Sequence, residues 1–277
     1  MALHIPTFLT RTGSAIVFAA IMLTGLLWNE WAFVILIAAI QTLCLHEYFK
    51  LIKNIFPQTN FPTWFVSILQ LLALSWLGLL FATGMHLLND VKYLFVPLLS
   101  AVVLMIIISL SKKGFLSGIL SVSALLYICM PISLLLLLRF IDIIFPIAFI
   151  VMIWTNDTMA YITGSVYGKT PFSKISPKKT WEGTISGGLL TIIIAGIWGY
   201  YSKRYHIEDW LILAAIVAIM GTIGDLLESK IKRSAGVKDS GKIMPGHGGA
   251  MDRFDSMLVA APFVFCYVLL FILTRTY

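Results

Sequence analysis

Long apolar runs recur along almost the whole chain, separated by short polar stretches. A helix needs roughly 17–25 apolar residues to cross a bilayer. On that length we predict nine spans, at approximately residues 12–28, 31–48, 62–84, 93–111, 115–138, 141–161, 183–201, 209–228 and 256–274. None of the polar stretches is long enough to link two soluble domains. The pattern therefore predicts an all-α, polytopic integral membrane protein with about nine transmembrane helices.

The polar positions divide this predicted protein into two regions. Residues 1–114 hold the N-terminal transmembrane helices, and residues 115–277 hold a C-terminal transmembrane region with two polar loops, 155–182 and 224–256. Within the first region, residues 48–61 alternate lysine with large apolar residues, which is typical of a segment lying in the headgroup plane. An ordinary basic connector fits those residues equally well.

Composition and charge add an orientation to this picture. The chain is 59% hydrophobic with a mean hydropathy of +0.93, whereas apolar residues make up about half of a soluble domain. Lysine and arginine in short loops favour the cytoplasmic side. With the N-terminus inside, fifteen of the twenty Lys and Arg residues fall on the inner side and five on the outer side. We therefore expect a cytoplasmic N-terminus and both polar loops on the cytoplasmic face.

Charges of both signs are most crowded between Gly224 and Ser256, which reads GDLLESKIKRSAGVKDSGKIMPGHGGAMDRFDS. Asp225 ends one apolar run, and Asp252 and Asp255 come just before the next. Mg²⁺ typically takes one or two carboxylates and completes its shell with water and substrate phosphates. Carboxylates at the mouths of membrane helices, with a basic Gly-rich loop between them, therefore suggest a metal-bound polyphosphate at a membrane surface.

Helical spacing groups some of these residues on one face. Glu228, Ser229 and Lys232 follow Asp225 at spacings of three, four and seven, so their side chains share a side of the helix. The alternative interpretation is a set of interfacial salt bridges, for instance Asp225 with Lys232 or Asp252 with Lys230. A single Asp would favour that alternative, but the density of acids, bases and glycines favours a binding site.

The glycine-rich part of the same stretch is Gly246-His247-Gly248-Gly249. A histidine flanked by glycines suits an anion-binding backbone nest or a donor to phosphate. A general-base role for His247 ranks low, because an attacking phosphate is already ionised at neutral pH.

The other polar loop begins inside an apolar run, where Asn156 and Asp157 interrupt the sixth predicted span. Ionisable groups at membrane depth are costly, so they are usually paired or functional. If the helix continues, Asp157, Tyr161 and Gly164 lie on one face. Gly164 and Gly168 would let the backbone come close to a ligand.

Further along this loop, Ser176-Pro177-Lys178-Lys179-Thr180 precedes Glu182 and the next apolar run. Two lysines held by a proline turn in front of a helix start are placed to contact phosphates, with the helix N-terminus adding positive potential. On this segment alone, the general bias of lysine towards the inner side is the stronger explanation.

The residues of these two loops resemble the signature of the phosphatidate cytidylyltransferases (CDP-diacylglycerol synthases). That signature runs Ser, Lys-Arg, Lys-Asp, Pro-Gly-His-Gly-Gly and Asp-Arg-x-Asp, and its matches here are Ser229, Lys232-Arg233, Lys238-Asp239, residues 245–249 and residues 252–255. The upstream elements Asn-Asp-x-x-Ala-Tyr, Gly-Lys and Ser-Pro-Lys-Lys-Thr-x-Glu-Gly match at residues 156–161, 168–169 and 176–183. These specific motifs cover roughly the C-terminal half, while the N-terminal spans match only in hydrophobicity.

The resemblance implies an enzyme of the bacterial cell (inner) membrane that joins CTP and phosphatidic acid into CDP-diacylglycerol and pyrophosphate at the cytoplasmic face. It also implies Mg²⁺ held by Asp225 and Asp252, with a second cation at the same site, for which K⁺ is one candidate. The expected partners are CTP, phosphatidic acid and the lipid bilayer, with a homodimer as an option and no nucleic acid.

The resemblance also carries roles over to individual residues. The implied catalytic residues are Asp225, Asp252, Lys232, Arg233 and His247. The implied substrate-binding residues come from both loops and are Asn156, Asp157, Tyr161, Lys169, Ser176, Lys178, Lys179, Thr180, Glu182, Ser229, Lys238, Asp239, Gly246, Gly248, Gly249, Arg253 and Asp255.

Two other functional classes fit parts of the pattern. Intramembrane carboxylates also mark the ion pathways of transporters, but here the charges gather on one face and no inverted repeat is visible. A closer alternative is another membrane CTP-dependent lipid transferase or a lipid-alcohol kinase. The complete His-Gly-Gly signature favours the cytidylyltransferase.

Overall fold

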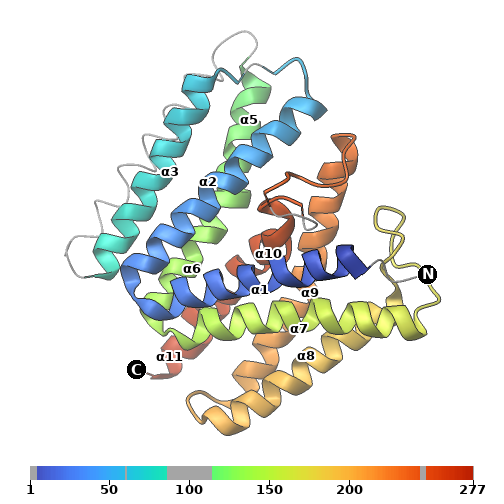
Figure 1. The fold of residues 1–277 in the computed structure, drawn as a ribbon. Coiled ribbons are helices and arrows are strands. Elements are labelled where there is room, and N and C mark those ends of the chain that lie inside the picture. The colour runs from blue at the N-terminus through green and yellow to red at the C-terminus, as the bar shows by residue number, and fades with distance from the viewer. Residues whose placement is uncertain (1–4, 60, 86–113, 244–247, 277) are drawn as a thin grey trace. The chain divides into compact units, whose positions relative to one another are not determined.

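The computed structural model describes residues 5–59, 61–85, 114–243 and 248–276. Throughout these ranges the chain is helical apart from its connections and one isolated antiparallel bridge, between Pro171 and Thr180 (Figure 1). The helices are α1 (Ile5–Trp28), α2 (Glu30–Ile55), α3 (Thr63–Gly84), α5 (Phe115–Ala124), α6 (Met130–Ile141), α7 (Ile144–Tyr167), α8 (Trp181–Ser202), α9 (Ile207–Ser234), α10 (Met251–Tyr267) and α11 (Leu273–Thr276). One π-helical turn, Leu125–Cys129, joins α5 to α6, and another, Val268–Ile272, joins α10 to α11.

Seven helical stretches are long and apolar enough to cross a membrane, and they confirm seven of the predicted spans as helices. They are Glu30–Ile55, Thr63–Gly84, Phe115–Ile141, Ile144–Tyr167, Trp181–Ser202, Ile207–Ser234 and Met251–Arg275. The first predicted span falls in α1, whose apolar part, Ile16–Trp28, is shorter than a full span. The predicted span at 93–111 lies outside the described residues. The protein is therefore an integral membrane protein with an all-helical fold in its described parts.

Several helices continue beyond the apolar runs that predicted them. Helix α2 extends through residues 48–55, so this part of the suggested headgroup-plane segment forms the last turns of α2. Helix α9 likewise continues to Ser234 and ends with Lys232 and Arg233 in its last turn. Basic residues suit the C-terminal end of a helix because they offset the partial negative charge of its unpaired carbonyls. Hydropathy marks where apolar residues stop, whereas backbone hydrogen bonds decide where the helix stops.

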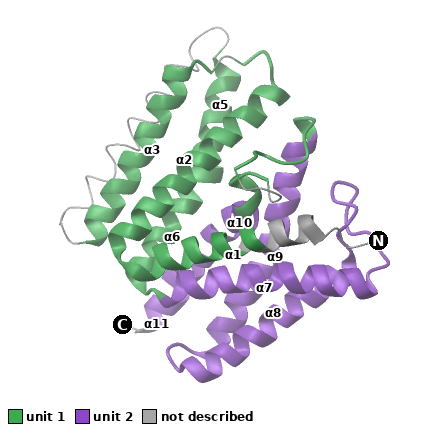
Figure 2. Ribbon diagram, viewed as in Figure 1, with its two compact units in different colours: residues 1–143, 234–253 green, residues 144–233, 254–277 purple. Residues whose placement is uncertain are grey.

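The described chain forms two compact units (Figure 2). Unit 1 contains residues 1–143 and 234–253, and unit 2 contains residues 144–233 and 254–277. This grouping by packing differs from the division at residue 114, which follows the position of polar residues along the sequence.

Unit 1 is built around α2, which packs against α1, α3, α5 and α6. Asn29 caps the start of α2, because its side-chain oxygen accepts a hydrogen bond from the Ala32 backbone N–H at 2.7 Å. Near the other end, the Tyr48 hydroxyl donates to the Leu120 carbonyl at 3.2 Å and lies 2.5 Å from the Ser123 hydroxyl. Both ends of α2 are thus fixed by polar contacts as well as by the apolar core between them.

Unit 2 contains a close helix pair, α7 and α8. Helix α8 buries a stripe of small residues, one in every four, namely Gly183, Gly187, Thr191, Ala195 and Gly199. A Cβ atom on Gly183 would lie 2.6 Å from the Ala160 carbonyl oxygen and 2.8 Å from the Gly164 Cα. Small residues at four-residue spacing let the backbones of membrane helices approach each other closely. The stripe therefore holds α7, which carries Asn156 and Asp157, directly against α8.

Gly224 allows a similarly close approach of backbones between α9 and α10, within unit 2. A Cβ atom at this position would overlap the Asp255 carbonyl oxygen and lie 3.1 Å from the Ser256 Cα. One turn earlier, a Cβ on Gly221 would lie 3.4 Å from the Ser256 Cβ. Since Asp225 follows Gly224 directly, this backbone contact determines how closely the turn carrying Asp225 approaches the turn carrying Asp255.

We predict that Gly224→Ala destabilises the protein by about 1–3 kcal/mol, the usual cost of overpacking, because the obstructing atoms belong to backbone. The measurement is the midpoint of thermal unfolding in detergent. Gly78→Ala is the matched control, since Gly78 lies within α3 and nothing stands within 4 Å of its added Cβ. Alanine forms helix better than glycine by about 1 kcal/mol, so the control should not lower the midpoint. An unchanged midpoint for Gly224→Ala would contradict the close contact.

Candidate active site

The connection between α7 and α8 is a closed loop with a proline turn at its tip. The Phe172 backbone N–H donates to the Lys179 carbonyl at 2.8 Å, and the Lys179 N–H donates to the Ser176 carbonyl at 3.0 Å. Pro177 occupies the second position of this turn, where the fixed φ of proline is favourable. The predicted proline turn in front of a helix start is confirmed.

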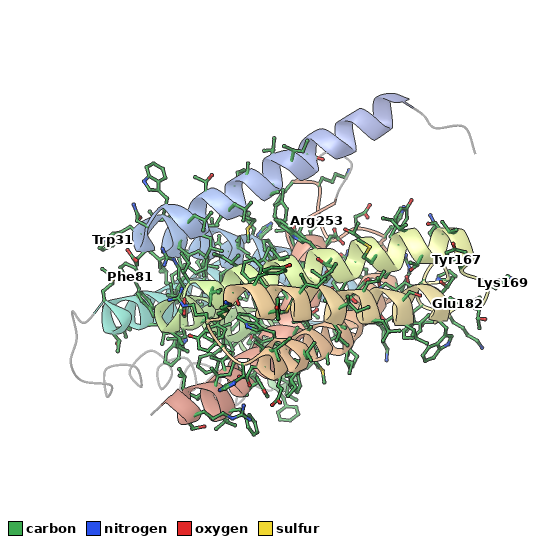
Figure 3. All side chains as sticks on the ribbon, turned by 90° about the horizontal axis from the view of Figure 1, so that it is seen from below. Trp31, Phe81, Tyr167, Lys169, Glu182 and Arg253 are labelled. Atoms are coloured by element: carbon green, nitrogen blue, oxygen red, sulfur yellow. The ribbon has the colours of Figure 1, made fainter. Side chains whose placement is uncertain are left out.

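Two residues with predicted substrate roles hold this loop onto α8. Thr180 caps the helix, because its hydroxyl oxygen accepts from the Gly183 backbone N–H at 3.2 Å. The Glu182 carboxylate accepts from the backbone N–H groups of Lys169 and Thr170, each at 3.2 Å, and from the Thr170 hydroxyl at 2.8 Å. Lys169 and Glu182 accordingly lie together at this end of unit 2 (Figure 3). Their binding of substrate stays a prediction.

Asp225 lies against a lysine of the loop. Its carboxylate forms an ion pair with the Lys179 ammonium and accepts a hydrogen bond from the Ser229 hydroxyl at 3.2 Å. Three predicted site residues, from two separate parts of the sequence, therefore meet at one point of unit 2. The neighbouring Lys178 is exposed.

A second ion pair lies one turn further along α9. Glu228 is fully buried, and its carboxylate pairs with the Lys232 ammonium four residues on. A buried acid without a partner would be strongly destabilising, so Lys232 is partly needed to balance Glu228. The sequence pattern placed Lys232 on the same helical face as Asp225 and Glu228, and the structure pairs it with Glu228, four residues earlier.

Two further acids of unit 2 lie near Asp255. Asp157 on α7 and Asp225 on α9 are both close enough to Asp255 on α10 for their charges to act on its carboxyl group. Like charges in one place are unfavourable unless cations offset them. The arrangement therefore suits the binding of cations, and Lys179 supplies one from the protein itself.

The start of this loop contributes packing as well as candidate chemistry. Asn156 is buried, whereas Asp157 and Tyr161 are exposed. A Cβ on Gly164 would lie 3.0 Å from the Thr180 hydroxyl oxygen. Protein atoms thus occupy the space beside Gly164, which the sequence pattern offered as room for a ligand.

In unit 1, Asp252 is held by the glycine-rich segment that precedes it. Its Oδ2 atom accepts from the Gly249 backbone N–H at 2.7 Å, the Ser240 N–H at 2.9 Å and the Ser240 hydroxyl at 3.0 Å. Gly248 adopts a φ of +82°, where a side chain would be strained, and an added Cβ would overlap that same oxygen. The glycines therefore allow the backbone to wrap closely around Asp252.

Sequence reasoning missed one residue of this arrangement, Glu47 on α2. Its carboxylate accepts from the Ser240 hydroxyl at 2.6 Å and from the Ala250 and Met251 backbone N–H groups, both at 2.9 Å. The available signal was an ionisable residue within a membrane-length apolar helix, which is costly unless it has partners.

The remaining predicted residues fall into two groups. The first group, which is exposed, contains Arg233, Lys238, Asp239 and Arg253. Gly246 and His247 lie outside the described residues, so their predicted contacts with phosphate stay predictions.

The predicted metal site rests on Asp225 in unit 2 and Asp252 in unit 1. Both are carboxylates with one oxygen already oriented by hydrogen-bond donors, which suits the oxygen chemistry of Mg²⁺. Among the described residues, no group of three or more His, Cys, Asp or Glu side chains could by itself hold a metal ion. Each carboxylate by itself therefore suits a hard divalent cation, and their sharing of one ion stays a prediction.

Comparison with known proteins gives one family match and a set of relatives. A family model described as the cytidylyltransferase family matches residues 9–271. A Synechocystis sp. protein named phosphatidate cytidylyltransferase is 46% identical over 43% of this chain and 41% of its own length. A protein of the same name from Haemophilus influenzae is 39% identical over 44% of this chain and 44% of its own length. Another, from Staphylococcus haemolyticus, is 48% identical over 42% of this chain and 45% of its own length. The aligned part spans less than half the length of these three relatives.

Proposed function

Because this chain belongs to the cytidylyltransferase family, we propose that it transfers the cytidylyl group of CTP to phosphatidic acid. The products are CDP-diacylglycerol, a precursor for phospholipid synthesis, and pyrophosphate. The family match over almost the whole chain carries this proposal. Relatives named phosphatidate cytidylyltransferase support the choice of phosphatidic acid as acceptor.

The proposed setting is the bacterial cell (inner) membrane, with about nine spans, a cytoplasmic N-terminus and the active site on the cytoplasmic face. The excess of Lys and Arg on that side supports the orientation. The proposed partners are CTP, phosphatidic acid, the lipid bilayer and, as an assembly to be tested by light scattering, a second copy of the chain.

The reaction joins two anions. An oxygen of the phosphatidic acid phosphate forms a bond to the α-phosphorus of CTP. The bond from that phosphorus to the oxygen bridging the β-phosphate breaks, and pyrophosphate leaves with the electron pair. No general base is needed, because the attacking phosphate is already ionised. The main task of the protein is therefore to offset repulsion and to hold the two reactants in line.

Cationic side chains would share that task. Lys179 lies against Asp225, so its ammonium is placed to contact phosphate oxygens that approach this carboxylate. Lys178 on the same turn, and Lys232 and Arg233 at the end of α9, add further positive charge. The Gly249 backbone N–H already donates to Asp252, so a nest for phosphate would use the N–H groups of Gly246 to Gly248.

Asp225 and Asp252 would hold Mg²⁺, with a second cation, for which K⁺ is a candidate, at the same site. A bound divalent cation would neutralise negative charge on the phosphate oxygens. The Ser229 hydroxyl donates to Asp225 and the Ser240 backbone N–H donates to Asp252, and these bonds orient the two carboxylates for that role.

We predict that Asp225→Asn and Asp252→Asn each lower the rate of CDP-lipid formation by about 10²–10³-fold or more, the range seen when one preorganised electrostatic group is removed. The assay uses purified protein in detergent with radiolabelled CTP, phosphatidic acid, Mg²⁺ and K⁺, with and without EDTA. Glu208→Gln is the control, since Glu208 is an exposed acid at the far end of α9. A folded variant with a near-normal rate would remove that aspartate from the proposed metal site.

We predict that Lys178→Ala raises the KM for CTP roughly three- to tenfold with little change in kcat, as expected from losing about 1 kcal/mol of uniform binding. Lys174→Ala is the matched control, because Lys174 is also exposed on this loop but lies outside the proline turn. Steady-state rates over a range of CTP concentrations provide the measurement. An unchanged KM for Lys178→Ala, or an equal rise in both variants, would argue against the contact.

A further inference from the structure

We infer that Glu47 is a positioning residue that ties the described parts of the signature segment, residues 240–243 and 248–252, to helix α2. Its effect on catalysis rests on the proposed function, while its effect on the segment does not. The contacts involved all lie within unit 1 and join residues about two hundred positions apart in the sequence.

The first reason is the free-energy cost of burying the Glu47 carboxylate within a membrane helix. Glu47 is 3% exposed and lies within a helix of membrane-spanning length. A buried carboxylate is strongly unfavourable unless several donors reach it. Here three donors do so, at 2.6, 2.9 and 2.9 Å. The signature segment supplies all three of these donors.

The second reason is the identity of two of those donors. Met251 is the first residue of α10, so the Ala250 and Met251 N–H groups belong to a helix start, where backbone donors lack partners inside the helix. A negative charge is also favoured at a helix N-terminus. Glu47 therefore caps α10 from a distant part of the chain. One of the N–H groups that it binds belongs to Met251, the residue directly before Asp252.

The third reason is a hydroxyl shared by two carboxylates. The Ser240 Oγ atom lies 2.6 Å from Glu47 Oε2 and 3.0 Å from Asp252 Oδ2. It has one proton to donate, and the Ser240 backbone N–H adds a separate bond to Asp252 Oδ2 at 2.9 Å. The position of Ser240, and through it that of Asp252, thus depends on Glu47.

Close packing restricts the segment further. Added Cβ atoms on Gly241 and Gly249 would each overlap the Glu47 carboxylate. Glycine is needed at both positions because the carboxylate occupies the space that a side chain would take. Glu47 thus fixes the segment by contact on two sides as well as by hydrogen bonds.

The test compares Glu47→Gln with Gln41→Leu, both in purified full-length protein. Gln41 is a buried polar residue of the same helix whose side chain has no hydrogen-bond partner among the described residues, so its replacement controls for altering a buried polar group. Hydrogen–deuterium exchange of the peptides covering residues 238–253 is the first readout and needs no activity. The second is the rate of CDP-lipid formation over a range of Mg²⁺ concentrations.

We expect Glu47→Gln to speed exchange in residues 238–253 while the rest of the chain exchanges as in the wild type. We also expect a fall of about 10–100-fold in kcat or in the apparent affinity for Mg²⁺, the usual cost of losing a group that orients a metal ligand. The KM for phosphatidic acid should stay unchanged. Gln41→Leu should leave all of these values near wild type.

Unchanged exchange and an unchanged Mg²⁺ response in Glu47→Gln would overturn the inference, as would equal effects from Gln41→Leu. If Glu47→Gln does not fold, Ser240→Ala decides, because it removes only the shared hydroxyl. Faster exchange of residues 238–253 and a weaker Mg²⁺ response would support the inference, and wild-type values would overturn it. If the wild type forms no CDP-lipid, the proposed function fails, but the exchange readout still decides whether Glu47 holds the segment.

Discussion

An ionisable side chain in a membrane helix must find partners, because the surrounding hydrocarbon offers none. In the described part of the chain, three buried acids meet that requirement differently. Glu47 accepts from a serine hydroxyl and the start of α10. Glu228 pairs with Lys232 on its own helix. Asp209 accepts from the Tyr267 hydroxyl at 2.8 Å and from Arg275 at 3.1 Å. The contacts of Glu47 and Asp209 join segments that lie far apart in the sequence.

Small residues let neighbouring helices and segments approach each other closely. Helices that carry large side chains stay too far apart for a short carboxylate to reach a neighbouring backbone. Gly183 and Gly187 remove that separation between α7 and α8, and Gly224 removes it between α9 and α10. Gly249 does the same beside Glu47. Among these polar contacts, those of Glu47 depend on glycine, because Gly241 and Gly249 leave the space that its carboxylate occupies.

The sequence predicted most of the helices, because an apolar run of membrane length leaves few alternatives. It also predicted the proline turn at Ser176–Lys179, since Pro at the second position favours one local geometry. Helix ends were less accurate, as in α2 and α9, because hydrogen bonding continues past the last apolar residue. Features that depend on neighbouring residues, such as helices and turns, can therefore be predicted from the sequence.

The partners of individual charges were not predictable in the same way. Asp225 had several candidate lysines within one turn or two, and the structure pairs it with Lys179 of a separate loop. Glu47 was not among the predicted site residues, because its donors come from residues 240–251. Which side chains meet across such distances depends on helix packing, and a single sequence does not reveal it. The spacing of the signature residues could identify the site but not the residue that holds it in place.

The most direct measurement is identification of the product that purified wild-type protein forms from CTP, Mg²⁺ and a panel of acceptors. The panel contains phosphatidic acid, diacylglycerol, a polyprenyl phosphate and no lipid, with products identified by mass spectrometry and pyrophosphate measured in parallel. We predict CDP-diacylglycerol with phosphatidic acid alone, in a one-to-one ratio with pyrophosphate. A phosphorylated lipid alcohol together with CDP would indicate a kinase, and a CDP-lipid formed only from another acceptor would change the substrate. No product with any acceptor, from protein shown to be folded, would contradict the proposed transferase and favour a transport function.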